Sequence, residues 1–178
     1  EILKNTMYSE LKGIKITFIN MPLREEAVPN VPPEGPGILS AIVRRHGGEP
    51  YIIDLNGYRI KDKLAKKRGL TNGRHLTNKE TENMISTHLN NVGEQDIFAF
   101  SGKITTLRWQ EEIAKIVKRL QPDCFLVTGN GLATEIKRGL FNWIPELDAI
   151  ARSEGDSVIF DICKDGKRIR DLGMQKAL

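Results

Sequence analysis

Three short polar turns, each directly after an apolar run, carry the residues of this chain that are best suited to hold a ligand. Glycines in such turns let the backbone approach a bulky ligand closely, and exposed N–H groups and hydroxyls supply hydrogen bonds. This chemistry suits the binding of a large, flat molecule. The turn residues that we expect to make these contacts are Ser101, Gly102, Lys103, Ile104, Thr105, Thr128, Gly129, Asn130, Gly131, Glu154 and Gly155.

Several of these side chains also have a purely structural interpretation. Ser101, Thr105 and the following Thr106 are as well suited to cap the next helix as to touch a ligand. Lys103 favours a polar ligand or solvent, because a cation does not stabilise the N-terminus of a helix. Glu154 either accepts hydrogen bonds from a ligand or stabilises the start of the last helix.

No residues with an evident role in catalysis accompany these turns. The sequence contains no Gly-x-Ser-x-Gly elbow, no Walker loop and no Gly-x-Gly-x-x-Gly fingerprint. No histidine is spaced with a cysteine or an acidic residue as in a metal site. Cys124 and Cys163 lie far apart, and we interpret both as small core residues. We therefore expect the chain alone to be non-catalytic.

Alternating strand and helix patterns must position these turns. Short apolar β-branched runs indicate strands, and apolar residues at helical spacing indicate helices. We expect strands at 14–19, 51–54, 97–100, 124–127 and 147–151, helices at 36–46, 77–91, 107–120 and 134–143, and a final helix that begins at 156–163. This order predicts an α/β fold with a doubly wound five-stranded parallel sheet, flavodoxin-like (Rossmann-like), in the strand order 2-1-3-4-5.

That strand order also predicts where a ligand would bind. In open α/β sheets the ligand crevice lies at the carboxyl edge, at the point where the strand order reverses. Here this switch point falls between the first and third strands. The loops after Asn20, Ser101 and Thr128 would then frame the crevice.

The length of 178 residues, 39% of them hydrophobic, suits one domain. We place this domain at 14–163, with an N-terminal extension at 1–13, a polar insertion at 57–79 and a C-terminal tail or linker at 164–178. Basic residues are densest at 61–74, where the absence of interleaved aromatic residues favours a solvated surface over nucleic-acid binding. No apolar run approaches the roughly 18 residues that span a bilayer, so we expect a cytoplasmic protein without a membrane partner.

Longer motifs follow one another in a recognisable order. They are Pro33-Glu-Gly-Pro-Gly-Ile38, Ile42-Val-Arg-Arg-His-Gly47, Tyr51-Ile-Ile-Asp-Leu55, Asp96-Ile-Phe-Ala-Phe-Ser101, Lys118-Arg-Leu-Gln-Pro-Asp123 and Leu147-Asp-Ala149 followed by Arg152-Ser-Glu-Gly-Asp156. Their order and spacing resemble the N-terminal, cobalamin-binding domain of cobalamin-dependent radical S-adenosylmethionine enzymes. The resemblance covers nearly all of residues 15–163.

The resemblance implies a base-off cobalamin whose cobalt takes no histidine ligand from the protein. It implies a nucleotide tail near Gly129, Gly131 and Glu154, and a corrin ring over residues 101–106. The catalytic half of such enzymes carries Cys-x3-Cys-x2-Cys for an iron–sulfur cluster, which this sequence lacks. S-adenosylmethionine and the cluster would belong to a radical catalytic domain or subunit, so this chain would be an excised domain or a separate partner. The reaction implied is methyl transfer to a substrate radical, as in a methyltransferase, although some relatives catalyse cyclisation or rearrangement.

Two other classes of function compete with this interpretation. A receiver-like signalling domain shares the strand order but needs clustered acids after the first strand and an aspartate after the third, where this chain has Asn20-Met21 and Ser101. A degenerate domain that only docks a partner would keep the fold without the cofactor. Asn130 and Leu132 favour that alternative, because they depart from the family's Gly-Gly-x-His-x-Thr pattern. Cobalamin affinity distinguishes a carrier from a docking module.

Overall fold

Runs rich in apolar and aromatic residues form five strands of a single sheet, in which every pairing is parallel. The computed structural model describes residues 10–23, 25, 32–152 and 154–173. The strands are β1 (Lys15–Asn20), β2 (Glu49–Asp54), β3 (Ile97–Ser101), β4 (Phe125–Gly129) and β5 (Ala149–Ile150). Their order is β2-β1-β3-β4-β5, which confirms the predicted doubly wound α/β fold.

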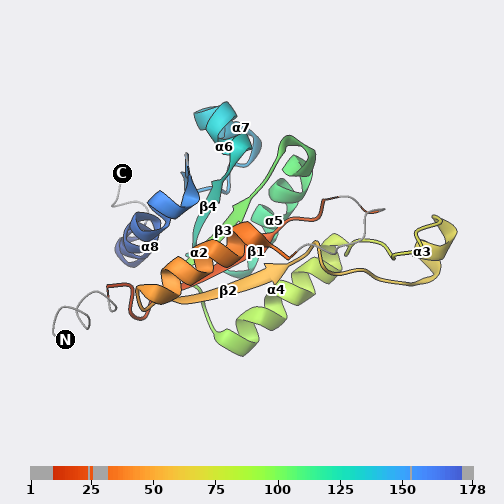
Figure 1. Ribbon diagram of the computed structural model, residues 1–178, viewed down its shortest axis with the longest axis horizontal. Coiled ribbons are helices and arrows are strands. Elements are labelled where there is room, and N and C mark those ends of the chain that lie inside the picture. Colours follow the sequence, from red (N-terminus) through yellow and green to blue (C-terminus); the bar gives the residue numbers. More distant parts are fainter. Residues whose placement is uncertain (1–9, 24, 26–31, 153, 174–178) are drawn as a thin grey trace.

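Helices cover both faces of this sheet (Figure 1). One face, here called the α2/α8 face, is covered by α2 (Glu34–Arg45) and α8 (Gly155–Leu172), which contact each other. The opposite α4/α5 face is covered by α4 (Asn78–Val92) and α5 (Leu107–Leu120). No helix in the described ranges is long and apolar enough to cross a membrane.

Side chains alternate between the two faces along each strand, so the sheet separates two apolar cores. In β1, Phe18 lies in the core under α2 and α8, whereas the next residue, Ile19, lies in the core under α4 and α5. Buried apolar side chains build both cores. The predicted core role of Cys124 and Cys163 is confirmed because both side chains are buried, and this burial raises the pKa of both thiols to about 12.

The predicted helix at 134–143 is wrong in its extent. The chain instead forms α6 (Gly131–Ile136), one 3₁₀ turn (Lys137–Gly139) and α7 (Leu140–Trp143). Lys137 has a φ of +55°, a left-handed conformation that ends an α-helix. The apolar spacing of this segment indicated a helix correctly, but it carried no signal for the break.

The final helix, which the sequence predicts to begin at 156–163, is α8. It continues to Leu172, through much of residues 164–178. Gly166 packs directly on the sheet, since an added Cβ would lie 2.8 Å from Cδ1 of Phe125. The Arg170 guanidinium then pairs with Asp96 at 2.7 Å. At the other end of the chain, Leu11 of the supposed N-terminal extension is buried in the core under α2 and α8.

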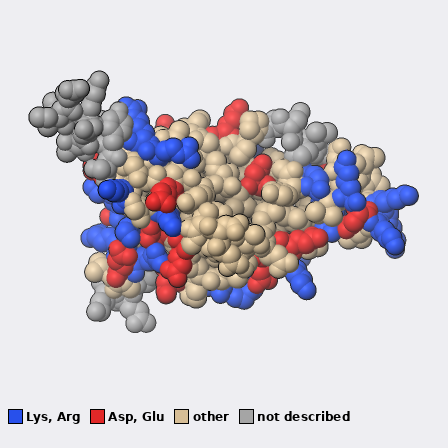
Figure 2. All heavy atoms as spheres, turned by 90° about the horizontal axis from the view of Figure 1, so that it is seen from below, with Lys and Arg blue, Asp and Glu red and all other residues tan. Residues whose placement is uncertain are grey.

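The polar insertion forms an arm that projects from the body and carries α3 (Lys63–Lys67) (Figure 1). A two-stranded bridge joins Ile60 to Arg74 at its base. The buried Arg74 pairs with Asp62 and Glu80, each at 2.7 Å, and its hydrogen bond holds the pKa of Glu80 at about 2. Figure 2 shows blue Lys and Arg side chains gathered at this end of the molecule.

Candidate functional site

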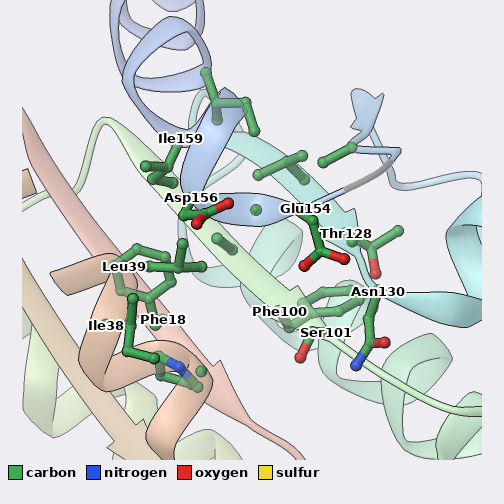
Figure 3. A pocket seen from close by; sticks show the side chains of 18 of the residues that line it. Phe18, Ile38, Leu39, Phe100, Ser101, Thr128, Asn130, Glu154, Asp156 and Ile159 are labelled. Atoms are coloured by element: carbon green, nitrogen blue, oxygen red, sulfur yellow. The ribbon is translucent and has the colours of Figure 1, made fainter. Parts of the chain in front are cut away.

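A pocket of about 590 Å³ opens on the α2/α8 face at the carboxyl edge of the sheet (Figure 3). It lies between α2 and α8, beside the switch point where the strand order reverses. Ligand pockets in proteins range from about 300 to 1,000 Å³, and open α/β sheets bind ligands at this edge. The described residues that line it include Phe18, Leu39, Ala99, Ser101, Val127, Gly129, Asn130, Gly131, Glu154, Gly155, Asp156 and Ile159.

The bottom of the pocket is apolar. Phe18, Ala99 and Val127 lie at adjacent positions on three neighbouring strands and are buried; we call them the floor. They face the same side because they are in register in a parallel sheet. Leu39 of α2 and Ile159 of α8 form the two walls (Figure 3).

The entrance to the pocket is polar. Ser101, Asn130, Glu154 and Asp156 are all exposed there and are here called the mouth (Figure 3). Two of these side chains, Glu154 and Asp156, are carboxylates, whereas no Lys or Arg is found among the described residues that line the pocket. The mouth therefore offers hydrogen-bond acceptors to amide and hydroxyl groups of a ligand.

Gly129 and Gly131 border space that the protein itself leaves open. A Cβ added at Gly129 would first meet Cβ of Ala151, at an ordinary contact distance of 3.5 Å, and one at Gly131 would meet nothing within 4 Å. Asn130 between them has a φ of +79°, and its side-chain oxygen accepts a hydrogen bond from the backbone N–H of Gly131. The turn after β4 is thus fixed by its own contacts, while Gly131 faces open space and Gly129 has room for a Cβ in ordinary contact with Ala151.

Gly102 has a different role from these two glycines. An added Cβ there would lie 2.0 Å from Nε2 and 2.4 Å from Cδ of Gln110, so the side chain of α5 occupies the space. Gln110 is buried on the α4/α5 side and accepts a hydrogen bond from the hydroxyl of Thr128 at 3.3 Å. Sequence reasoning missed Gln110, although it lies three residues before Ile113 on the buried face of α5.

The remaining turn residues after β3 lie at the same edge, outside the pocket lining. Lys103, Ile104 and Thr105 are exposed. The backbone N–H and C=O of Lys103 both bond to the hydroxyl of Thr106, which provides the local structural role that the sequence left open. Neither Ser101 nor Thr105 forms a side-chain hydrogen bond within the described part of the chain. Their hydroxyls therefore do not cap the following helix.

Among the predicted site residues, the structure brings seven into the lining of one pocket. These are Ser101, Thr128, Gly129, Asn130, Gly131, Glu154 and Gly155. Thr128 is part of the pocket lining, although its hydroxyl donates a hydrogen bond to Gln110 on the other side of the sheet. Gly155 permits the close approach of α8 to α2, since its Cβ would lie 3.3 Å from Leu39. Glu154 precedes α8 without a side-chain cap bond, so its carboxylate stays exposed at the mouth.

Sequence analysis missed the apolar half of the pocket. Phe18, Ala99 and Val127 lie within strands, where any apolar side chain is first interpreted as core. Leu39 and Ile159 were likewise indistinguishable from ordinary helix packing. Only the tertiary arrangement shows that these side chains surround a hollow. The arrangement as a whole suits an elongated ligand with an apolar end buried and a polar part at the mouth.

Comparisons with known proteins bear on the fold alone. No model of a known protein family matches the chain, and no curated protein matches it. The crystal structure of an uncharacterized protein from Neptuniibacter caesariensis is similar, with a TM-score of 0.52 and 9% identity over 90% of this chain and 92% of that one. The crystal structure of 3-deoxy-D-manno-octulosonate 8-phosphate phosphatase from Moraxella catarrhalis, in complex with magnesium, phosphate and KDO, aligns over 98% of this chain and 99% of that chain. Its TM-score of 0.39 and 14% identity are too low to carry an argument.

Proposed function

We propose that this chain binds cobalamin and serves as the cofactor-carrying domain of a radical S-adenosylmethionine enzyme. The observation that carries the proposal is the pocket between α2 and α8, with an apolar floor, a polar mouth and two glycines beside open space. A second support is the order of sequence motifs, which resembles that of the cobalamin-binding domains of this family. The proposal includes a catalytic domain or subunit that holds the iron–sulfur cluster and S-adenosylmethionine.

The residues present fit the parts of this cofactor. The base at the end of the nucleotide tail suits the apolar floor, and the tail would pass Gly129 and Gly131, where a Cβ has room. Amide side chains of the corrin ring would donate hydrogen bonds to Glu154 and Asn130. The sequence lacks the Asp-x-His-x-x-Gly signature of other cobalamin proteins, which agrees with a base-off cobalamin without a histidine ligand.

When bound, cobalamin supplies a cobalt-held methyl group for transfer to a substrate radical. The chain's own residues bind and orient the cofactor. The mouth carboxylate of Glu154 would accept hydrogen bonds from amide groups of the bound cofactor and so orient it, and the floor would exclude water from the base. Lys103, Ile104 and Thr105 lie exposed at the same sheet edge, where the corrin face would rest.

Absorption spectroscopy after gel filtration with hydroxocobalamin tests this proposal. Cobalamin that co-elutes with a base-off spectrum supports a carrier domain. Gly131→Val should abolish binding by filling the open space, with Gly129→Val as a second variant. Gly37→Val is the matched control, because Gly37 also has no atom within 4 Å but lies outside the pocket lining. Unchanged affinity in both pocket variants would contradict the tail site.

A docking module without cofactor is the second candidate. It is favoured by exposed apolar side chains on the loops and helix that surround the mouth, namely Leu23, Ile38 and Ile104, each more than half exposed. A docking module should show no cobalamin affinity, even after addition of a radical partner domain. Loss of partner binding in Leu23→Ser, in a chain that binds no cobalamin, would support the docking role.

A further inference from the structure

The floor of the pocket provides no hydrogen-bonding side chain. Phe18, Ala99 and Val127 are hydrocarbon, and their backbone groups lie within strands that pair on both sides. The walls Leu39 and Ile159 are hydrocarbon as well. Anything that reaches this depth therefore meets only apolar side chains among the described lining residues.

The nearest buried hydroxyls do not change this picture. The Thr128 hydroxyl points to the α4/α5 side and donates to Gln110. The Ser40 hydroxyl on α2 is buried, but Ser40 lies outside the pocket lining. The other polar side chains that line the pocket are exposed or half-buried, namely Ser101, Asn130, Thr134, Glu135, Glu154 and Asp156. Polarity thus falls from the mouth to the floor.

From this gradient we propose that the pocket selects among cobamides by the polarity of their lower base, and that it takes an apolar base such as 5,6-dimethylbenzimidazole in preference to a purine such as adenine. The inference rests on the proposed function, because it assumes that the nucleotide tail enters this pocket. Adenine is similar in size but carries an exocyclic amine and additional ring nitrogens. Buried against hydrocarbon, these groups lose their hydrogen bonds to water and gain none.

The expected discrimination follows from that loss. One buried polar group left without a partner weakens binding by about tenfold or more. Dimethylbenzimidazole buries a single ring-nitrogen acceptor, fewer polar groups than adenine, and its two methyl groups gain from burial on the floor. We therefore expect cobalamin to bind at least about tenfold more tightly than the cobamide that carries adenine.

Titration of the chain with three corrinoids tests the inference. The probes are cobalamin, the adenine-bearing cobamide, and cobinamide, which has the corrin ring but no nucleotide or base. We expect cobalamin to bind most tightly. Equal affinities for cobalamin and the adenine cobamide would overturn the inference while leaving the proposed function intact, as would equal affinities for all three probes. No binding of any probe would overturn the proposed function itself.

Two floor variants sharpen the test. Val127→Thr keeps the shape of the side chain and adds a hydroxyl, and Ala99→Ser adds one at the neighbouring strand. Each should reduce the preference for cobalamin by about threefold or more, because a polar partner becomes available to the purine. Val158→Thr on α8, outside the pocket lining, is the matched control and should keep the wild-type preference. An unchanged preference in whichever floor variant folds, judged by circular dichroism, would show that the base is recognised elsewhere.

Discussion

On the α4/α5 face, the turn after β3 is filled by the protein's own side chains, whereas on the α2/α8 face the turn after β4 borders a hollow. Gln110 occupies the space beside Gly102 and bonds to Thr128. No atom lies within 4 Å of a Cβ added at Gly131. Two glycine-containing turns at one sheet edge therefore serve different purposes. A glycine after a strand indicates a ligand only where the protein does not fill the space itself.

The largest expected effect compares two isoleucines with matched burial. Ile113 under α5 and Ile159 at the pocket wall are 1% and 2% exposed. Ile113→Ala should reduce the free energy of unfolding by about 3–4 kcal/mol, because a cavity opens in a closed core. Ile159→Ala should cost about 1–2 kcal/mol less, since one side of Ile159 already faces the hollow. Equal losses in urea denaturation would show that the two faces are packed alike.

The next largest change in the free energy of unfolding is expected from glycine substitutions at the two turns. Gly102→Val should lower the free energy of unfolding by about 2 kcal/mol, because the new side chain collides with Gln110. Gly131→Val should change it by less than about 0.5 kcal/mol, since its surroundings are open. Chemical denaturation of both variants measures the difference. A fully stable Gly102→Val protein would contradict the closed packing on the α4/α5 face.

A smaller effect is expected from Gln110→Leu. The substitution leaves the buried Thr128 hydroxyl without its acceptor, which should cost about 1–2 kcal/mol of unfolding free energy. Corrinoid affinity should stay unchanged, because Gln110 lies on the face opposite the pocket. Arg108→Leu, at an exposed position on the same helix, serves as the control for loss of a polar side chain. A loss of corrinoid binding in Gln110→Leu would show that the two faces of the sheet are energetically coupled, contrary to their separation in the structure.

The smallest effect concerns pH. His88 on α4 bonds to the Thr17 hydroxyl at 2.8 Å, and burial lowers its pKa below 6.5. The folded chain therefore stays neutral at His88 where the unfolded chain takes up a proton, so stability should fall as pH drops below about 6.5. His88→Gln should make the urea midpoint less dependent on pH between about 7.5 and 5.5. Thr87→Gln changes the exposed neighbour and should keep the wild-type pH dependence of the urea midpoint. If His88→Gln also keeps that dependence, groups other than His88 cause it.

The sequence carries enough local information to predict the framework. The strand order and the bounds of α5 agree with expectation, because apolar periodicity reports directly on which face of an element is buried. The sequence does not predict the end of α8, because residues 164–172 are rich in charge and Lys167 and Arg170 pair with the distant Asp96. The polar mouth was predicted from turn residues, but the floor was not. A strand side chain beside a hollow has the same sequence signature as one in a filled core.

The walls of the pocket come from opposite ends of the chain. Leu39 and Ile159 are separated by most of the sequence, and β1 pairs with β3 through Ile16 and Ile97. Such non-local pairing slows folding, because long loops must close before the contacts form. On a ribosome the floor strands would emerge well before α8. The pocket is thus completed only when the last helix docks, which makes binding a readout of finished folding.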